Sequence, residues 1–187
     1  ETAFDLIADA LYVNKIYENK KEIEKVVLEM METVGLEKRL MNSYPHELDG
    51  GRRQRIGIAR GLVMRPEFIV LDEPVSALDV SIQAQVLNLL QDIQEDKKLT
   101  YLFISHDLSV VRHLSDRVAV MYLGRMVELA DYVQIFENPL HPYTKALLSA
   151  IPVPEYNYNQ ERIILKGDVP SPIDPPDRCV SVSYTHL

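Results

Sequence analysis

Two short apolar runs, each followed at once by polar residues, constrain the fold of this chain more than any other feature. Phe68 to Leu71 and Tyr101 to Ile104 show no polar alternation, which indicates strands buried on both faces, as in a parallel sheet. A stretch with helical spacing, residues 81–95, lies between them. Strand, helix and strand in this order predict an α/β fold with a largely parallel sheet.

Apolar spacing elsewhere predicts further elements around this unit. Helices are expected at residues 21–34, 52–64, 108–114 and 143–150, and strands at 117–123 and 126–129. The turn at Gly124 makes the last two strands an antiparallel hairpin. A proline-rich extended stretch is expected at residues 151–176.

Charge and cysteine content exclude several classes of protein. The 187 residues include 20 Lys plus Arg and 28 Asp plus Glu, a net charge of −8, which argues against a sequence-independent grip on nucleic acid or anionic lipid. The single cysteine, Cys179, permits no intrachain disulfide and fits a reducing, cytosolic setting. No apolar run approaches the roughly 20 residues that span a bilayer, so a membrane role is expected to come through a partner.

Three polar clusters stand where α/β proteins bind ligands, at strand carboxyl ends or a helix amino end. Asp72 and Glu73 follow the first strand; one carboxylate can hold Mg²⁺ through its water shell, and the next can orient or deprotonate a water molecule. His106 follows the second strand. Each cluster alone is also typical of solvated surface residues, but the three in this order are specific.

The third cluster, residues 48–52, opens the helix expected at 52–64. Its paired glycines, Gly50 and Gly51, let a phosphate approach the backbone, and the helix dipole favours an anion there. Arg52 and Arg53 lie in the first turn, where cations are disfavoured unless an anion docks nearby.

These segments resemble the motifs of the ATP-binding-cassette (ABC) ATPases. Residues 44–55 are similar to the ABC signature motif, 68–74 to Walker B with its catalytic Glu, 76–79 to the D-loop, and His106 to the switch histidine. Residues 138–148 and 167–172 resemble the ATPase subunits of oligopeptide and dipeptide importers.

The resemblance implies part of a P-loop ABC ATPase: a helical subdomain plus the C-terminal half of a mostly parallel sheet core, with an extended C-terminal arm. We expect the helical (signature) subdomain at residues 1–66 and the C-terminal half of the ATPase core at 67–130. The family-specific arm is expected at 131–180, and residues 181–187 leave the family pattern and are read as a non-native tail.

The resemblance also implies roles for individual residues, with ATP and Mg²⁺ as cofactors. Asp72 would hold Mg²⁺ via water, Glu73 would be the general base, and His106 would sense the γ-phosphate. The signature residues would contact the γ-phosphate of ATP held by a facing subunit, and Asp79 would couple the two sites. The signature residues are Leu48, Asp49, Gly50, Gly51 and Arg52.

The implied partners are a second ABC ATPase subunit, in a homo- or heterodimer, and transmembrane permease subunits, with a solute-binding protein acting indirectly and no nucleic acid. The chain would then lie at the cytoplasmic face of the cell membrane, peripheral through the permeases. The transported solute stays open among dipeptides, oligopeptides, nickel and others.

Two departures from the family pattern qualify these roles. Asp49 stands where the family usually has Ser, and Arg52 where Gln is common; a carboxylate repels phosphate, and Arg52 is expected to offset that charge. None of the seven glycines is followed by Lys-Ser or Lys-Thr, so the chain has no G-x-x-x-x-G-K-[ST] loop. The family's other ATP-binding elements are expected upstream of residue 1, and the chain alone is predicted to be inactive.

Three other interpretations stay open on sequence alone. A DNA-maintenance ATPase shares the signature and Walker B motifs, but it would show heptad coiled coils or basic surfaces, which this sequence lacks. A translation-factor ATPase would carry two cassettes in one chain. A truncated, non-catalytic product is the third, and an upstream Walker A motif in frame would exclude it.

Overall fold

The structure, a computed structural model, describes residues 1–151 and 163. The chain divides into two compact units, Glu1–His106 (unit 1) and Asp107–Leu187 (unit 2). The boundaries expected near residues 66 and 130 stay predictions. Apart from residues 151 and 163, the expected proline-rich stretch lies outside the described residues, as do Cys179 and the tail at 181–187.

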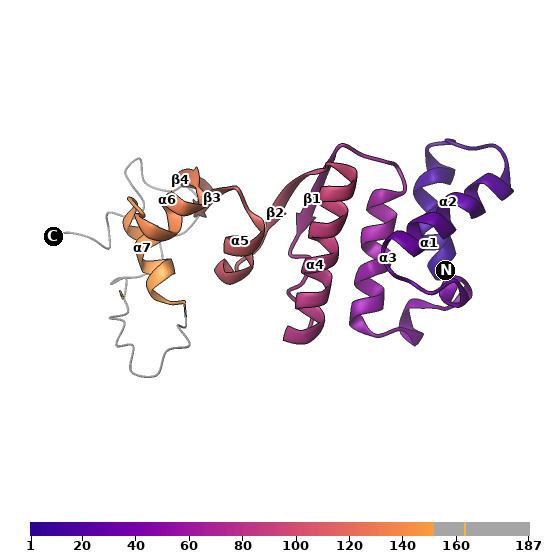
Figure 1. Cartoon of the computed structure of the whole chain (residues 1–187), viewed down its shortest axis with the longest axis horizontal. Coiled ribbons are helices and arrows are strands. Elements are labelled where there is room, and N and C mark those ends of the chain that lie inside the picture. Colours follow the sequence, from indigo (N-terminus) through magenta and orange to yellow (C-terminus); the bar gives the residue numbers. More distant parts are fainter. Residues whose placement is uncertain (152–162, 164–187) are drawn as a thin grey trace. The chain divides into compact units, whose positions relative to one another are not determined.

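Helices α1, α2 and α3 pack together in the first part of unit 1 (Figure 1). Their bounds are α1 Ala3–Val13, α2 Lys20–Thr33 and α3 Gly50–Leu62, with 3-10 turns η1 Lys38–Asn42 and η2 Pro45–Glu47. The predicted helices at 21–34 and 52–64 are thus confirmed, and α1 is an addition. Thr2 and Asp5 form a capping box that begins α1, a signal present in the sequence.

The second part of unit 1 is a β-α-β unit. Strand β1 (Phe68–Asp72) pairs in parallel with β2 (Thr100–Ile104), and α4 (Val80–Lys97) connects them (Figure 1). The predicted parallel pairing is therefore confirmed. The Tyr101 hydroxyl donates to the backbone oxygen of Leu90 in α4, which fixes α4 against β2, and burial raises the pKa of Tyr101 to about 12.

The prediction that β1 and β2 are buried on both faces is wrong for the described residues. Ile69 and Leu71 pair with Tyr101 and Phe103 on the face that carries α4, and these side chains are buried or half-buried. The opposite face of the two described strands carries exposed apolar side chains. They are Phe68, Val70, Leu102 and Ile104.

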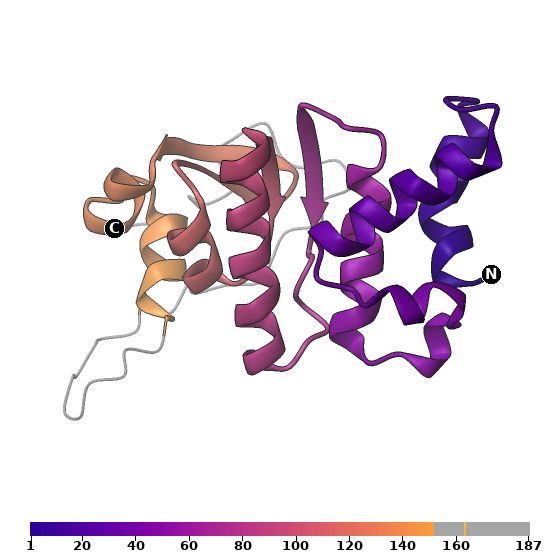
Figure 2. The ribbon, with the colours of Figure 1, turned by 45° about the vertical axis from the view of Figure 1, so that its right-hand side comes forward.

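Unit 2 is a β-hairpin with helices around it. Its elements are α5 Leu108–Leu114, β3 Arg117–Tyr122, β4 Arg125–Asp131, α6 Tyr132–Glu137 and α7 Pro142–Ser149 (Figure 2). The strands are antiparallel, which confirms the predicted hairpin. Leu123 and Gly124 have φ of 48° and 75°, the conformation of a two-residue type I′ turn.

Glu128 connects the hairpin of unit 2 to the start of α7 by hydrogen bonds. Its carboxylate accepts from the backbone N–H of Leu140 at 2.8 Å and of His141 at 3.1 Å. Burial would raise the pKa of Glu128, but the nearby Thr144 side chain and the hydrogen bonds from these two amides outweigh it and hold the pKa below its ordinary value. The Tyr143 ring adds a contact with Tyr122, with centroids 4.3 Å apart.

Candidate functional site

Asp72 and Glu73 follow β1 at the carboxyl edge of the parallel pair. Asp72 is the last residue of β1 and pairs with Ile104 of β2, and its side chain is exposed. The Glu73 N–H donates to the Ile104 carbonyl at 2.9 Å, which extends the ladder by one bond. Glu73 then takes a φ of 46°, a left-handed conformation that is rare for a residue with a side chain and that clusters at functional sites.

The structure brings Glu73 and His106 into contact. His106 Nδ1 lies 2.9 Å from Glu73 Oε1, and the two side chains are 75% and 46% exposed. The hydrogen bond with His106 lowers the pKa of Glu73, and the nearby Ser76 side chain adds to the effect. Glu73 is therefore ionised at neutral pH, and a reacting water or phosphate could reach both side chains from solvent.

Asp72 fits the chemistry of a magnesium ligand. Mg²⁺ is typically held by one or two carboxylates together with substrate phosphates and several waters. No group of three or more His, Cys, Asp or Glu in residues 1–151 could hold a metal ion by itself. An Mg²⁺ ion at the exposed carboxylate of Asp72 would therefore take its remaining ligands from phosphate and water.

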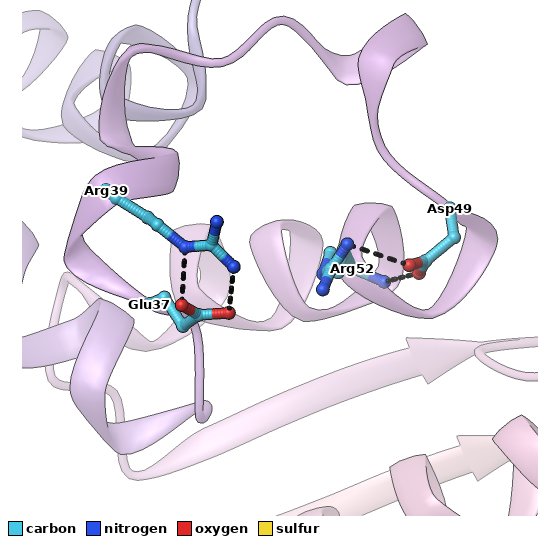
Figure 3. Close-up of polar contacts among 4 residues, drawn as sticks. All are labelled: Glu37, Arg39, Asp49 and Arg52. Atoms are coloured by element: carbon cyan, nitrogen blue, oxygen red, sulfur yellow. Dashed lines mark hydrogen bonds and ion pairs between the residues drawn. The ribbon is translucent and has the colours of Figure 1, made fainter.

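The signature residues form the amino end of α3. Asp49 is the N-cap: its carboxylate accepts from the Arg52 N–H at 2.8 Å. The Arg52 guanidinium also lies 3.3 Å from the same carboxylate, so Asp49 and Arg52 form an ion pair (Figure 3). Leu48, just before the cap, is buried.

The glycines that open α3 pack against the chain's own D-loop segment and α4. A Cβ added to Gly50 would lie 3.1 Å from Leu78 Cδ2, and one added to Gly51 would lie 2.6 Å from Ile82 Cγ2. Only glycine fits such an approach at Gly51 without a shift of Ile82. The sequence suggested these glycines for phosphate access, and the structure adds this packing, for which the sequence held no signal.

Asp79, the D-loop acid, is the N-cap of α4. It accepts from the Ile82 N–H at 3.1 Å and the Ser81 hydroxyl at 2.9 Å, and these bonds lower the pKa of Asp79. Leu78 and Ile82 thus pack the start of α4 against the start of α3, and Asp79 caps α4 beside them. The structure assembles two groups: Asp72 with Glu73 and His106, and the signature residues with the D-loop.

Ser76 supports the backbone turn at Glu73, whereas its place in the sequence predicted only that it belongs to the D-loop. Its hydroxyl donates to the Glu73 backbone carbonyl at 3.1 Å, and its N–H approaches the same oxygen at 3.4 Å. This turn supports the unusual backbone of Glu73. The Pro-Val-Ser sequence after Glu73 was the available signal, since proline and serine favour turns.

In the described part of the chain, no helix is long and apolar enough to cross a membrane.

Comparison with protein families gives two matches. The ABC transporter family model matches residues 4–76, and the model described as "Oligopeptide/dipeptide transporter, C-terminal region" matches residues 127–180. The oligopeptide transport ATP-binding protein OppF of Bacillus subtilis is 58% identical over 167 residues, which cover 89% of this chain and 55% of that protein. The dipeptide transport ATP-binding protein DppF of Haemophilus influenzae is 56% identical, over 93% of this chain and 53% of its own length.

Solved structures agree with these matches. A dimeric ATP-binding cassette in a post-hydrolysis state, bound to ADP and Pi, aligns with a TM-score of 0.60 and 29% identity, over 70% of this chain and 56% of the cassette. The structure of cbiO1 from Clostridium perfringens, part of an ABC transporter complex, aligns with a TM-score of 0.64 and 26% identity, over 73% and 53%. The chain spans about half the length of the curated relatives it matches. It belongs to the ABC ATPases, in the group of oligopeptide and dipeptide transport ATP-binding subunits.

Proposed function

We propose that this chain is part of an ATP-hydrolysing subunit that energises the import of peptides. The observation that carries the proposal is the contact between Glu73 and His106 beside Asp72, at the carboxyl ends of two parallel strands. Ligands bind at this edge in open α/β sheets. The printed names of the relatives, oligopeptide and dipeptide transport ATP-binding proteins, support the choice of solute class.

Each residue at the strand ends has a defined role in this proposal. Asp72 would hold Mg²⁺ through its water shell, and the ion would supply neutralisation of charge on the phosphates. Glu73 orients the attacking water and accepts its proton as general base, a role that needs the ionised carboxylate that a glutamate carries at neutral pH. His106 holds the Glu73 carboxylate and contacts the γ-phosphate.

The signature residues act on a second subunit in this proposal. Leu48 to Arg52 complete an ATP site held by a facing ABC ATPase subunit, and Asp79 couples the two sites. Closure and reopening of this dimer would be passed to transmembrane permease subunits at the cytoplasmic face of the membrane. A solute-binding protein would deliver the peptide to those permeases.

The sequence of this chain contains no phosphate-binding loop, and we expect this to limit ATP binding and hydrolysis by the chain alone. Without a G-x-x-x-x-G-K-[ST] segment in its sequence, it has no loop to cradle the β- and γ-phosphates. We therefore expect the purified 187-residue chain neither to bind ATP tightly nor to hydrolyse it. Turnover by this chain that survives further purification would contradict that expectation.

The proposal is tested in the complete subunit, expressed with its partner ATPase. Glu73→Gln should lower the steady-state ATPase rate by about 10²- to 10⁴-fold, since the amide cannot accept a proton. Glu67→Gln is the matched control, because Glu67 is exposed, lies just before β1 and should leave the rate unchanged. Equal rates in the two variants would refute the role of Glu73.

A further inference from the structure

Arg55 joins the second turn of α3 to the carboxyl end of α2. Its guanidinium donates to the Val34 backbone carbonyl at 2.7 Å, and the Arg55 side chain is half-buried. Val34 is the C-cap of α2. Since the acceptor is a backbone atom, the contact depends on the Arg55 side chain and not on the side chain at residue 34.

The way in which α2 ends leaves this carbonyl available. Gly35 has a φ of 66°, and its N–H donates to the Glu32 carbonyl at 2.9 Å. The Leu36 N–H donates to the Met31 carbonyl at 2.8 Å. These are the two hydrogen bonds of a Schellman motif, and neither uses the Val34 carbonyl. That carbonyl stands at the negative end of the helix dipole, where a cation is stabilising.

Gly35 also leaves room for the guanidinium. A Cβ added to Gly35 would lie 2.9 Å from Arg55 Nη1. The positive φ already favours glycine at this position, and the close approach of Arg55 is a second reason for it. The end of α2 is therefore shaped to receive the Arg55 side chain.

The contact lies close to the signature residues. Arg55 is about one turn along α3 from Gly51, which packs against Ile82 of α4. The first turns of α3 are thus held by α4 at Gly51 and by α2 at Arg55. Further along α3, Arg60 pairs with Asp9 of α1 at 3.1 Å, but these side chains are 54% and 51% exposed. An exposed ion pair contributes little, whereas a half-buried hydrogen bond from a charged group contributes more.

We propose that Arg55 is a positioning residue, which holds the amino end of α3 in place for association with a facing ATPase subunit. This inference rests on the proposed function, in which that end of α3 meets the facing subunit. Arg55 touches neither the nucleotide nor the facing subunit here, and it acts through the position of α3. Without the contact, association would have to fix α3 as well, which lowers affinity.

The experiment measures Mg-ATP-dependent association of the complete subunit with its partner ATPase. Glu73→Gln is present throughout to stop turnover, and sedimentation gives the ATP concentration at half-association. Arg55→Met keeps an unbranched apolar stem and removes the charge and the donors, so it should raise this concentration by about three- to tenfold. Arg55→Lys keeps the charge but not the planar fork, and it should give an intermediate value.

Two controls separate positioning from stability. Arg60→Met removes the exposed arginine contact of the same helix and should leave the ATP concentration at half-association unchanged. Ile7→Val removes a methyl group from a buried position in α1, so it lowers the thermal unfolding midpoint. At a temperature where the variants are folded, Ile7→Val should also leave the ATP concentration unchanged.

The outcomes distinguish this inference from the proposed function. An unchanged ATP requirement in Arg55→Met, together with a lowered unfolding midpoint, would mean that Arg55 only stabilises the fold and would overturn the inference. A rise in Ile7→Val as large as that in Arg55→Met would overturn it too. If Arg55→Met does not fold, Arg55→Lys is judged by the same two comparisons. Absence of ATP-dependent association in the subunit that carries Glu73→Gln alone would overturn the proposed function, and this inference with it.

Discussion

The amino end of α3 and the end of β1 carry the two halves of the candidate site, and they differ in how tightly the chain holds them. At α3, Gly51 lies against Ile82 and Asp49 is bound to Arg52. At β1, the carboxylates of Asp72 and Glu73 are exposed, and Glu73 is in contact with an exposed His106. The first region is defined by packing and capping, and the second by side chains that stand in solvent.

This difference separates two reasons for a residue's identity. At a packed position, a substitution changes the free energy of unfolding, because neighbouring atoms have to move. At an exposed position, the same size of change leaves stability nearly untouched and alters chemistry instead. Stability measurements on this chain can therefore distinguish the packed residues of the candidate site from the exposed ones without any nucleotide.

The largest effect on stability is expected at Gly51. Gly51→Ala should lower the free energy of unfolding by about 1–3 kcal/mol, because the new Cβ would lie 2.6 Å from Ile82 Cγ2 and the branched Ile82 cannot turn away freely. Urea denaturation of the chain measures this. Asp72→Asn is the control from the exposed region and should change stability by less than about 0.5 kcal/mol. Equal losses in both variants would remove the distinction between the regions.

Gly57, further along α3, should respond in the opposite direction. A Cβ added there meets no atom within 4 Å, and alanine is the better helix former. Gly57→Ala should therefore raise the free energy of unfolding by about 0.5–1 kcal/mol in the same urea experiment. A loss of stability would show that space on this side of α3 is more restricted than the structure indicates.

The smallest effect is electrostatic and lies at Glu73. His106→Ala should raise the pKa of Glu73 towards its ordinary value, because His106 is the largest cause of the lowering. Carboxyl NMR titration of the chain measures the shift, and His46→Ala, on η2, is the control. A lowered folded-state pKa stabilises the fold at pH above the ordinary value, and this contribution is lost as the pH falls through the lowered pKa. An unchanged Glu73 titration would mean that the contact does not persist in solution.

Sequence patterns predicted the elements that carry the site better than their surroundings. The apolar runs and their polar ends located β1, β2 and the Glu73–His106 edge, because parallel strands bring their carboxyl ends together. Burial on both faces failed for Phe68 and Val70, since periodicity reports which faces are apolar and not what covers them. The Gly51–Ile82 approach depends on the crossing of two helices, which no local pattern encodes.

The open face of the β1–β2 pair has a consequence for handling the protein. Four large apolar side chains, Phe68, Val70, Leu102 and Ile104, lie on it, each about half exposed. Exposed apolar surfaces of this kind promote aggregation, and a net charge of −8 is expected to oppose association between copies of the chain. Mild acidification, which removes negative charge, and high salt, which screens it, should both bring the purified chain out of solution well before it unfolds.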